Sequence, residues 1–308
     1  MKINKLYLVL FLLALVAPAI LYPVFLMKVL CFALFACAFN LLLGFVGLLS
    51  FGHAAFLGTG GYVTGALMLH TGIGPALSVV VGTIAAGLLG AVYGKLAVKR
   101  EGIYFAMVTL ALAQLAFFFY LQSPFTGGED GLQGVPRGTL FGIFDLSDNI
   151  VMYYFVLAIF IFGFWLIHRT IHSPFGQILK AIRENEPRAV SLGYNVNDYK
   201  WVVFIISAAL AGLAGSTKTL VFQLASLTDI HWHMSGEVVL MTLLGGMGTI
   251  FGPVVGAGVV VTIQNYLSGG ELGNYIHIIM GLIFIVCVLA FRSGIVGEIQ
   301  KVIKRNFS

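Results

Sequence analysis

The feature that most constrains the fold of this chain is a succession of long apolar stretches separated by short polar connections. We identify ten of them, at 6–22, 24–49, 54–70, 75–97, 103–121, 150–168, 200–220, 236–250, 252–268 and 274–291. A helix needs about 20 apolar residues to cross the hydrocarbon core of a bilayer, and its backbone polar groups are paired within the segment. The sequence therefore predicts an all-α polytopic membrane protein with about ten transmembrane helices.

The composition supports this class and excludes others. Hydrophobic residues make up 59% of the chain and charged residues 9%, whereas soluble domains carry about 25% charged residues. The net charge of +5 is spread over short loops and the chain ends, so nucleic acid is not expected as a partner. Cys31, Cys37 and Cys287 lie in apolar stretches without the spacing of a disulfide framework or a zinc site. We expect a single transmembrane domain over 1–308, in contact with lipid.

The basic residues predict the orientation of the spans. With the N-terminus inside, every lysine and arginine except Lys28, Arg137 and Lys218 lies in an inner loop or tail. Most acidic residues, Asp229 and Glu237 included, then fall on the outer side. Because cytoplasmic loops carry an excess of Lys and Arg, we expect both termini and the polar segment 169–200 to be cytoplasmic. The loop 122–149 would be extracytoplasmic, as a docking place for a partner or as a cover over the outer mouth.

Glycine is concentrated in two runs, 44–65 and 245–258. Small residues let helices approach closely in a membrane. Broken or re-entrant helices are the alternative at 50–53 and 245–253, since irregular backbone is tolerated where it lines a cavity. In chain order the ten spans divide into five followed by five, and an odd number in each half would make the two halves inverted in the membrane. This arrangement permits an inverted 5+5 repeat.

The segment 169–200 is the one long polar connection with a helical pattern of its own. Ser173 and Pro174 have the features of a helix start, a capping hydroxyl and a proline at the first helical position. One apolar face follows at helical spacing, formed by Phe175, Ile178, Leu179 and Ile182. Pro187 either ends this helix or begins a second one, which Gly193 would end in the left-handed conformation. Such a pair suits docking into another protein, and lying on the lipid surface is the alternative.

Within the spans, polarity is sparse and neutral. The candidates for lining a translocation path are Asn40, Ser50, Gly52, His53, Thr59, Gln114, Gln264 and Asn265. For each single polar side chain we favour the competing interpretation of an interhelical hydrogen bond, and this includes His53 at the inner end of a span. Transporters driven by protons or sodium bury carboxylates at mid-membrane, because an ion needs an anionic partner there. The scarcity of charge away from the span ends predicts that energy for transport enters elsewhere.

No arrangement of residues predicts an enzyme, because no nucleophile–base pair stands out in the spans. The run 212–219 approaches the phosphate-loop pattern, but Thr217 stands where the glycine before Lys218 should be, and the run lies in a span. His231 and His233 have, with Glu237, a metal-ligand spacing that is common by chance. We expect no catalytic or metal site, no bound cofactor, and no ATP binding by this chain itself.

Five stretches carry a resemblance to a known family: 40–56, 102–110, 126–132, 173–193 and 244–249. In these stretches the chain resembles the membrane permeases of ATP-binding-cassette (ABC) importers, and most closely the LivM-type subunit for branched-chain amino acids. The resemblance implies a multi-pass permease of the bacterial cytoplasmic (inner) membrane that translocates leucine, isoleucine and valine. It also implies a LivH-type second permease, two ABC ATPase subunits that bind ATP and magnesium, and an extracytoplasmic substrate-binding protein.

The resemblance further implies that 174–193 is the segment received by the ATPase. The coupling residues would be Phe175, Ile178, Leu179, Ile182, Arg183, Glu184, Arg188 and Gly193. We expect the apolar face to be buried by the partner, with the three charged residues at the rim. Here the chain departs from the general importer signature, because 187–189 reads Pro-Arg-Ala in place of Glu-Ala-Ala.

Two alternatives remain open at this stage. Related permeases of the same architecture import urea or short amides, and the matching stretches do not separate these substrates from amino acids. The alternative from another class is a facilitator or channel that works without partners, which uptake by the chain alone, without ATP, would reveal.

Overall fold

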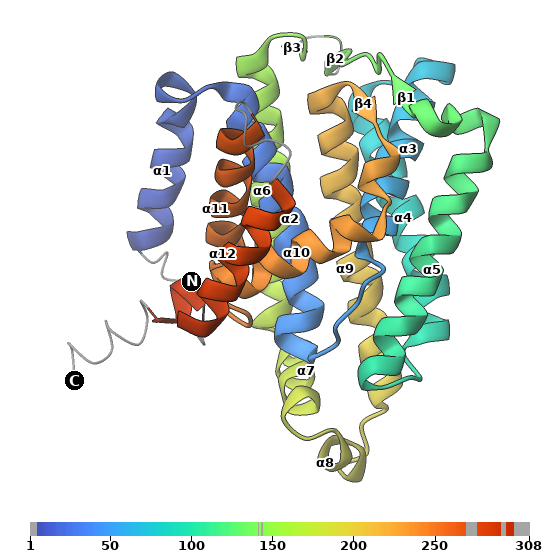
Figure 1. Ribbon diagram of the computed structural model, residues 1–308, viewed down its shortest axis with the longest axis vertical. Helices are drawn as coiled ribbons and strands as arrows, with labels where there is room; N and C mark the ends of the chain where they lie inside the picture. Colours follow the sequence, from blue (N-terminus) through green and yellow to red (C-terminus); the bar gives the residue numbers. More distant parts are fainter. Residues whose placement is uncertain (1–4, 141, 143, 269–275, 291–293, 299–308) are drawn as a thin grey trace.

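The computed structural model describes residues 5–140, 142, 144–268, 276–290 and 294–298 (Figure 1). Twelve α-helices lie in these residues: α1 Lys5–Ile20, α2 Pro23–Val46, α3 His53–Thr71, α4 Pro75–Ala97, α5 Gly102–Gln122, α6 Asn149–Ile171, α7 Pro174–Glu184, α8 Glu186–Ser191, α9 Val196–Phe222, α10 Trp232–Gly245, α11 Gly252–Ser268 and α12 Ile276–Ala290. Ten of them overlap the ten predicted spans, and α7 with α8 forms the predicted pair between them. The prediction of a helical protein is therefore confirmed.

Among the described residues, five helices are each long and apolar enough to cross a membrane, namely α2, α4, α5, α6 and α9. Helix α10 has 14 residues, fewer than the roughly 20 that a span needs. The predicted span at 236–250 is thus wrong in its bounds, because the helix begins at Trp232 and ends at Gly245. The count of ten spans and the inverted repeat stay predictions. The predicted location of the termini concerns 1–4 and 299–308, which lie outside the described residues.

Helices α2 and α9 form the buried centre of the bundle. In their most apolar stretches, 89% of α2 and 72% of α9 is buried inside the protein, against 22% of α5. Helix α9 packs against α2, α3 and α4, while α2 also contacts α6, α10 and α11 (Figure 1). Phe35 and Phe39 of α2 meet Phe56 of α3 and Phe204 of α9 in this core, all fully buried. Packing of this kind holds helices together in lipid, which is itself as apolar as the side chains.

Glycines let the central helices touch at backbone distance, as predicted. A Cβ atom built on Gly215 of α9 would overlap the carbonyl oxygen of Leu57, and one on Gly60 of α3 would overlap the carbonyl of Gly212. The second glycine run does the same for α10 and α11, where Gly256 lies against the carbonyl of Met241. Irregular backbone, which the alternative of broken or re-entrant helices predicts at 50–53 and 245–253, is present at 47–52 and 246–251. These positions lie in or beside the connections α2–α3 and α10–α11.

One end of the bundle, the strand end, carries the short strands and 3₁₀ helices. Their bounds are η1 Pro124–Thr126, η2 Gly128–Asp130, β1 Leu132–Gln133, β2 Thr139–Leu140, β3 Phe144–Asp145, β4 Leu224–Ala225 and η3 Leu227–Asp229. Strand β1 pairs antiparallel with β4, and β2 with β3. Arg137 donates hydrogen bonds to Asn149 Oδ1 and to the Val221 carbonyl, both at 2.8 Å. The loop 122–149 is therefore fastened to the end of α9.

Irregular backbone enters the bundle between β4 and α10, where the sequence predicts an outer loop. Ile230 packs against Gly58 of α3. Ser235 accepts a hydrogen bond from the Ala54 amide at 3.0 Å, near the start of α3. Helix α10 consequently starts inside the bundle and crosses it obliquely, well below the strands (Figure 1). The segment 226–245 thus runs into the bundle instead of over its end.

Candidate functional site

The pair α7–α8 projects from the end of the bundle opposite the strands (Figure 1), which we call the segment end. Ser173 caps α7 by accepting a hydrogen bond from the Gly176 amide at 3.3 Å. Asn185 caps α8 in the same way, accepting from the Arg188 amide at 3.0 Å. Gly193 has a φ of 89°, the left-handed conformation that terminates the pair. The predicted start, the second short helix and the predicted glycine stop are all confirmed.

The apolar face of α7 is covered by this chain itself. Leu179 is 1% exposed and joins the main core, and Ile182 is 3% exposed. Ile182 packs with Ala189 of α8 and Val196 of α9. The Phe175 ring stacks on Tyr199, with the centroids 5.6 Å apart. The expectation that a partner buries this face is therefore wrong for Leu179 and Ile182, and the half-buried Phe175 and Ile178 also pack inward.

Polar contacts fasten the same pair to α2 and α9. Glu186 and Lys200 form an ion pair at 2.6 Å, in which the lysine side chain is only 3% exposed. The guanidinium of Arg183 donates a hydrogen bond to the carbonyl of Gly44, in the last turn of α2. The exposed residues of the pair and its exit include the charged Arg183, Glu184 and Arg188 and the large apolar Val190, Leu192 and Tyr194. We call 184–194 the tip.

Asn40, a predicted path residue, instead fixes the connection between α10 and α11. Its amide nitrogen donates to the Thr249 carbonyl at 2.9 Å, and its oxygen accepts from the Gly248 amide at 3.0 Å. Asn40 is 3% exposed and lies one turn before Gly44. The pair α7–α8 is therefore linked through α2 to the α10–α11 connection.

His53 also has a structural role, as favoured from the sequence. It is fully buried at the start of α3, with its Nε2 2.8 Å from the hydroxyl oxygen of Ser207. That hydroxyl donates to the carbonyl of Ala38 at 2.5 Å, so the histidine Nε2 carries the proton and donates to it. The rings of Phe39 and Phe56 meet the imidazole edge to face, at 5.0 and 5.6 Å between centroids. The geometry joins α2, α3 and α9.

Four further path candidates lie away from the cavities described below. Ser50 is buried and accepts a hydrogen bond from the Gly52 amide at 3.2 Å. A Cβ on Gly52 would lie 3.0 Å from the carbonyl oxygen of Thr109, so this glycine serves the contact with α5. Thr59 is 5% exposed within α3, and Gln114 is half-buried on α5. None of them lines either of the two chambers described next.

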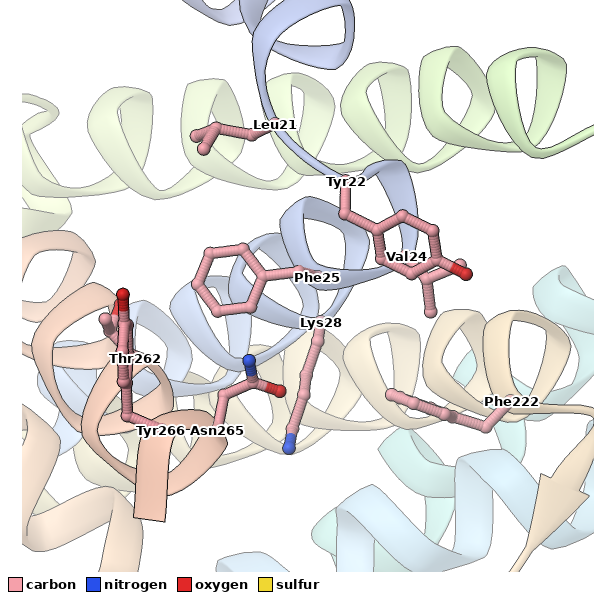
Figure 2. A pocket seen from close by; sticks show the side chains of 9 residues that line it. All are labelled: Leu21, Tyr22, Val24, Phe25, Lys28, Phe222, Thr262, Asn265 and Tyr266. Atoms are coloured by element: carbon pink, nitrogen blue, oxygen red, sulfur yellow. The ribbon is translucent and has the colours of Figure 1, made fainter. Parts of the chain in front are cut away.

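Two cavities open at the strand end, and they hold the remaining two candidates. The first, which we call the apolar chamber, has a volume of about 600 Å³ and is shown in Figure 2. Its lining consists of Leu21, Tyr22, Val24, Phe25, Lys28, Phe222, Thr262, Asn265 and Tyr266. Asn265 extends into this chamber from α11, and Lys28 from α2 (Figure 2).

The second cavity, which we call the charged chamber, has a volume of about 460 Å³. It is lined by Lys28, Phe32, Lys218, Phe222, Leu224, Ser226, Thr228, Asp229, Met234, Glu237 and Gln264. The two chambers share Lys28 and Phe222, so they adjoin one another. Lys218 forms an ion pair with Asp229, and the two side chains are 15% and 10% exposed. The rings of Phe32 and Phe222 lie 5.4 and 5.9 Å from the lysine ammonium.

This charged cluster was not predicted from the sequence, although the distribution of basic residues contains a signal for it. Lys28 and Lys218 are two of the three basic residues that depart from the positive-inside pattern. Asp229 and Glu237 follow α9. The sequence places Asp229 in an outer loop and Glu237 at the outer end of the span 236–250. Only the descent of η3 and α10 into the bundle brings them beside the two lysines. Gly212 to Thr219, the phosphate-loop-like run, lies wholly within helix α9, and its Lys218 points to Asp229.

Comparison with known proteins identifies the family of this chain. The family model described as "Branched-chain amino acid transport system / permease component" matches residues 23–288. The high-affinity branched-chain amino acid transport system permease protein LivM of Escherichia coli (strain K12) is 26% identical over 279 residues, which are 83% of this chain and 65% of that protein. The chain thus spans somewhat less than two thirds of that relative's length.

Two further relatives are covered more completely. The corresponding permease protein LivH of Salmonella typhimurium is 26% identical over 300 residues, 88% of this chain and 93% of that protein. The ribose import permease protein RbsC of Bacillus subtilis (strain 168) is 26% identical over 273 residues, 80% of this chain and 81% of that protein. No solved structure matches the chain significantly.

Proposed function

The chain belongs to the family of branched-chain amino acid transport system permease components, and on this premise we propose that it is the permease subunit of an ATP-driven importer of leucine, isoleucine and valine. The observation that carries the proposal is the family match over 23–288, from α2 into α12. The chain is a multi-pass membrane protein, and we place it in the bacterial cytoplasmic membrane with α7–α8 on the cytoplasmic side.

The distribution of chemistry along the chain supports an external motor. The phosphate-loop-like run lies inside helix α9, where its backbone amides are committed to helical hydrogen bonds. Partner ATPases would bind ATP and Mg²⁺ and act on the permease through the tip. There, exposed Val190 and Leu192 offer apolar contact, and Glu184 and Arg188 surround them with charge. A packed apolar centre with a charged rim is typical of protein interfaces.

The inward contacts of α7–α8 give this docking a mechanical consequence. Because Ile182 and Lys200 bind the pair to the start of α9, and Arg183 binds it to α2, a displacement of the tip moves both central helices. Asn40 extends the connection from α2 to the α10–α11 turn. ATP binding and hydrolysis would then shift the populations of outward- and inward-open states.

The remaining partners follow from the same proposal. A LivH-type permease would complete the pore, and a substrate-binding protein would deliver amino acids at the strand end. The loop 122–149, fastened to α9 through Arg137, is the surface on which that protein would dock.

A sugar importer is the second candidate, because ribose import permeases are among the relatives. Ribose, like urea and short amides, has no charge. The charged chamber favours an amino acid over these solutes, since it presents two ammonium groups and two carboxylates to the space that a substrate would enter.

The test is to purify this chain with the permease, ATPase and binding-protein subunits of its gene cluster and to measure which solute stimulates ATP hydrolysis. Leucine, isoleucine and valine are expected to stimulate it, and ribose and urea are not. Stimulation by ribose or urea alone would contradict the substrate assignment. A chain that co-purifies with no ATPase and takes up leucine without ATP would be a facilitator.

A further inference from the structure

The charged chamber gathers four ionisable side chains from four separate elements. Lys28 comes from α2, Lys218 from α9, Asp229 from η3 and Glu237 from α10. Two formal positive charges and two formal negative charges therefore face one cavity within the bundle. Charged side chains in membrane proteins are costly, and they concentrate where they serve a solute or one another.

Among these four charged side chains the structure shows one ion pair, between Lys218 and Asp229. Lys218 and Asp229 bind each other directly, and two aromatic rings flank the lysine. In the part of the chain that the structure describes, Lys28 and Glu237 form no ion pair, although each is half-buried and Lys28 lies in the electrostatic field of both Lys218 and Glu237. One cationic and one anionic group are thus free to bind a ligand that carries both charges.

The adjoining apolar chamber is lined by uncharged side chains apart from Lys28. Leu21, Val24 and Phe25 line it from the start of α2 and its connection to α1, and Phe222 lines it from the end of α9. Lys28 lies at the junction, because it lines both chambers. Figure 2 shows the lysine ammonium at the far end of this chamber from Leu21. The combined space thus has a charged end and an apolar end.

We propose that the two chambers together bind one zwitterionic amino acid with an apolar side chain, the α-carboxylate at Lys28, the α-ammonium at Glu237, and the side chain against Phe25 and Phe222. The choice of an amino acid rests on the proposed function, whereas the demand for both charges rests on the cavity alone. The Lys218–Asp229 pair positions the site by holding η3 against α9. A ligand with one charge leaves Lys28 or Glu237 desolvated without a partner, which disfavours its binding.

The site is tested by equilibrium binding of radiolabelled L-leucine to the full chain in lipid nanodiscs. Unlabelled L-leucine is expected to displace the label, whereas leucinamide (no carboxylate), 4-methylpentanoate (no ammonium) and D-ribose are expected to compete at least about tenfold more weakly, the factor for one lost charged hydrogen bond. This comparison needs no variant. Absence of leucine binding, or equal competition by either half-charged analogue, overturns the proposal.

Substitutions at Lys28 and Glu237 then test which charged group of the ligand each residue binds. Lys28→Met and Glu237→Gln are each expected to weaken leucine binding about tenfold or more. Glu237→Gln should also abolish the preference for leucine over 4-methylpentanoate, and Lys28→Met the preference over leucinamide. Lys28→Arg and Glu237→Asp keep the charge and are expected to retain binding, and Lys99→Met is the control at an exposed lysine outside both chambers. Wild-type selectivity in both neutral variants overturns the assignment.

Uptake by the complete importer separates this inference from the proposed function. ATP-driven leucine uptake that is unaffected by Lys28→Met and Glu237→Gln leaves the proposed function standing and refutes the site. Zwitterion-selective binding by the chain, without ATP-driven uptake by the assembly, leaves the site standing and refutes the proposed function.

Discussion

His53, Ser207 and Ala38 form a short hydrogen-bonded chain between three buried helices. The imidazole N–H of His53 donates to the Ser207 hydroxyl, which in turn donates to the Ala38 carbonyl. No water replaces a lost partner easily at a site that is 0% exposed. A buried donor without an acceptor costs its desolvation energy, about 1–3 kcal/mol. This small network therefore fixes how α2, α3 and α9 meet.

We predict that Ser207→Ala lowers the free energy of unfolding by about 1–3 kcal/mol, because the His53 N–H loses its acceptor. Thermal or SDS-induced unfolding of the purified chain measures the change. Ser191→Ala, at an exposed serine of α8, is the matched control and is expected to have an effect within about 0.5 kcal/mol. Equal stability of the two variants would show that the His53–Ser207 bond contributes nothing.

Residues whose role depends on near neighbours in sequence were predictable, and the others were not. The caps Ser173 and Gly193 act within a few residues of themselves, so their type and spacing were sufficient. Asn40 and His53 could only be named as candidates, because a polar side chain in a span can face either a pore or another helix. Which of these occurs depends on residues far away in sequence, such as Thr249 and Ser207.

At the scale of elements, the contact of α3 with α9 shows how a glycine lets two helices pack at backbone distance. Gly215 lies so close to the Leu57 carbonyl that no side chain fits between the two backbones. By contrast, Gly258 of α11 has no atom within 4 Å of the position of a Cβ. The two glycines look alike in the sequence, and only the packing separates them.

We predict that Gly215→Ala destabilises the chain by about 1–3 kcal/mol or more, because the new methyl group must push α3 and α9 apart. Gly258→Ala, the control, should leave stability unchanged or raise it, since alanine favours the helix. Both are measured by unfolding in the same detergent or nanodisc. A Gly215→Ala variant as stable as the control would contradict the close packing of these helices.

The tip of α7–α8 and its buried face should respond differently to the same substitution. Leu192 is 68% exposed, so Leu192→Asp is expected to weaken ATPase binding by about 2 kcal/mol and leave stability unchanged. Ile182→Asp places a carboxylate in a packed site and is expected to cost about 3 kcal/mol or more of stability. Gln177→Asp, exposed on α7, should do neither.

Pull-down of the ATPase and thermal unfolding distinguish these outcomes. Retention of the ATPase at wild-type level by Leu192→Asp would remove the tip from the interface.

The amphipathic pattern of 174–182 was recognisable from the sequence, but its meaning was not. The pattern indicates that one face is buried. Only the fold shows that α2, α8 and α9 bury it.

For the whole molecule, the order of ten apolar helices around a polar pair was predictable, because each apolar run is a local signal. The course of 226–245 was not, since 226–235 has the pattern of an outer loop and 236–250 that of a span. The resulting bundle has two distinct ends, with the strands at one and α7–α8 at the other (Figure 1). These ends should face opposite sides of the membrane.

We predict that single cysteines at Asp130 and Asn197 label from opposite sides with a membrane-impermeant reagent, in a chain without the native Cys31, Cys37 and Cys287. Both positions are exposed, and neither caps a helix through its side chain. Asp130 should label from outside in intact cells, and Asn197 only after the membrane is opened. Labelling of both from the same side would contradict the topology.

The central claim is that this chain imports amino acids with energy supplied by partner ATPases. Its most direct test is uptake of radiolabelled L-leucine into proteoliposomes that contain this chain, the second permease and the ATPases, with the binding protein outside and ATP on the α7–α8 side. We predict accumulation of leucine above its external concentration with ATP, and none with a non-hydrolysable analogue. Equal uptake with and without ATP, or uptake by this chain alone, would contradict the claim.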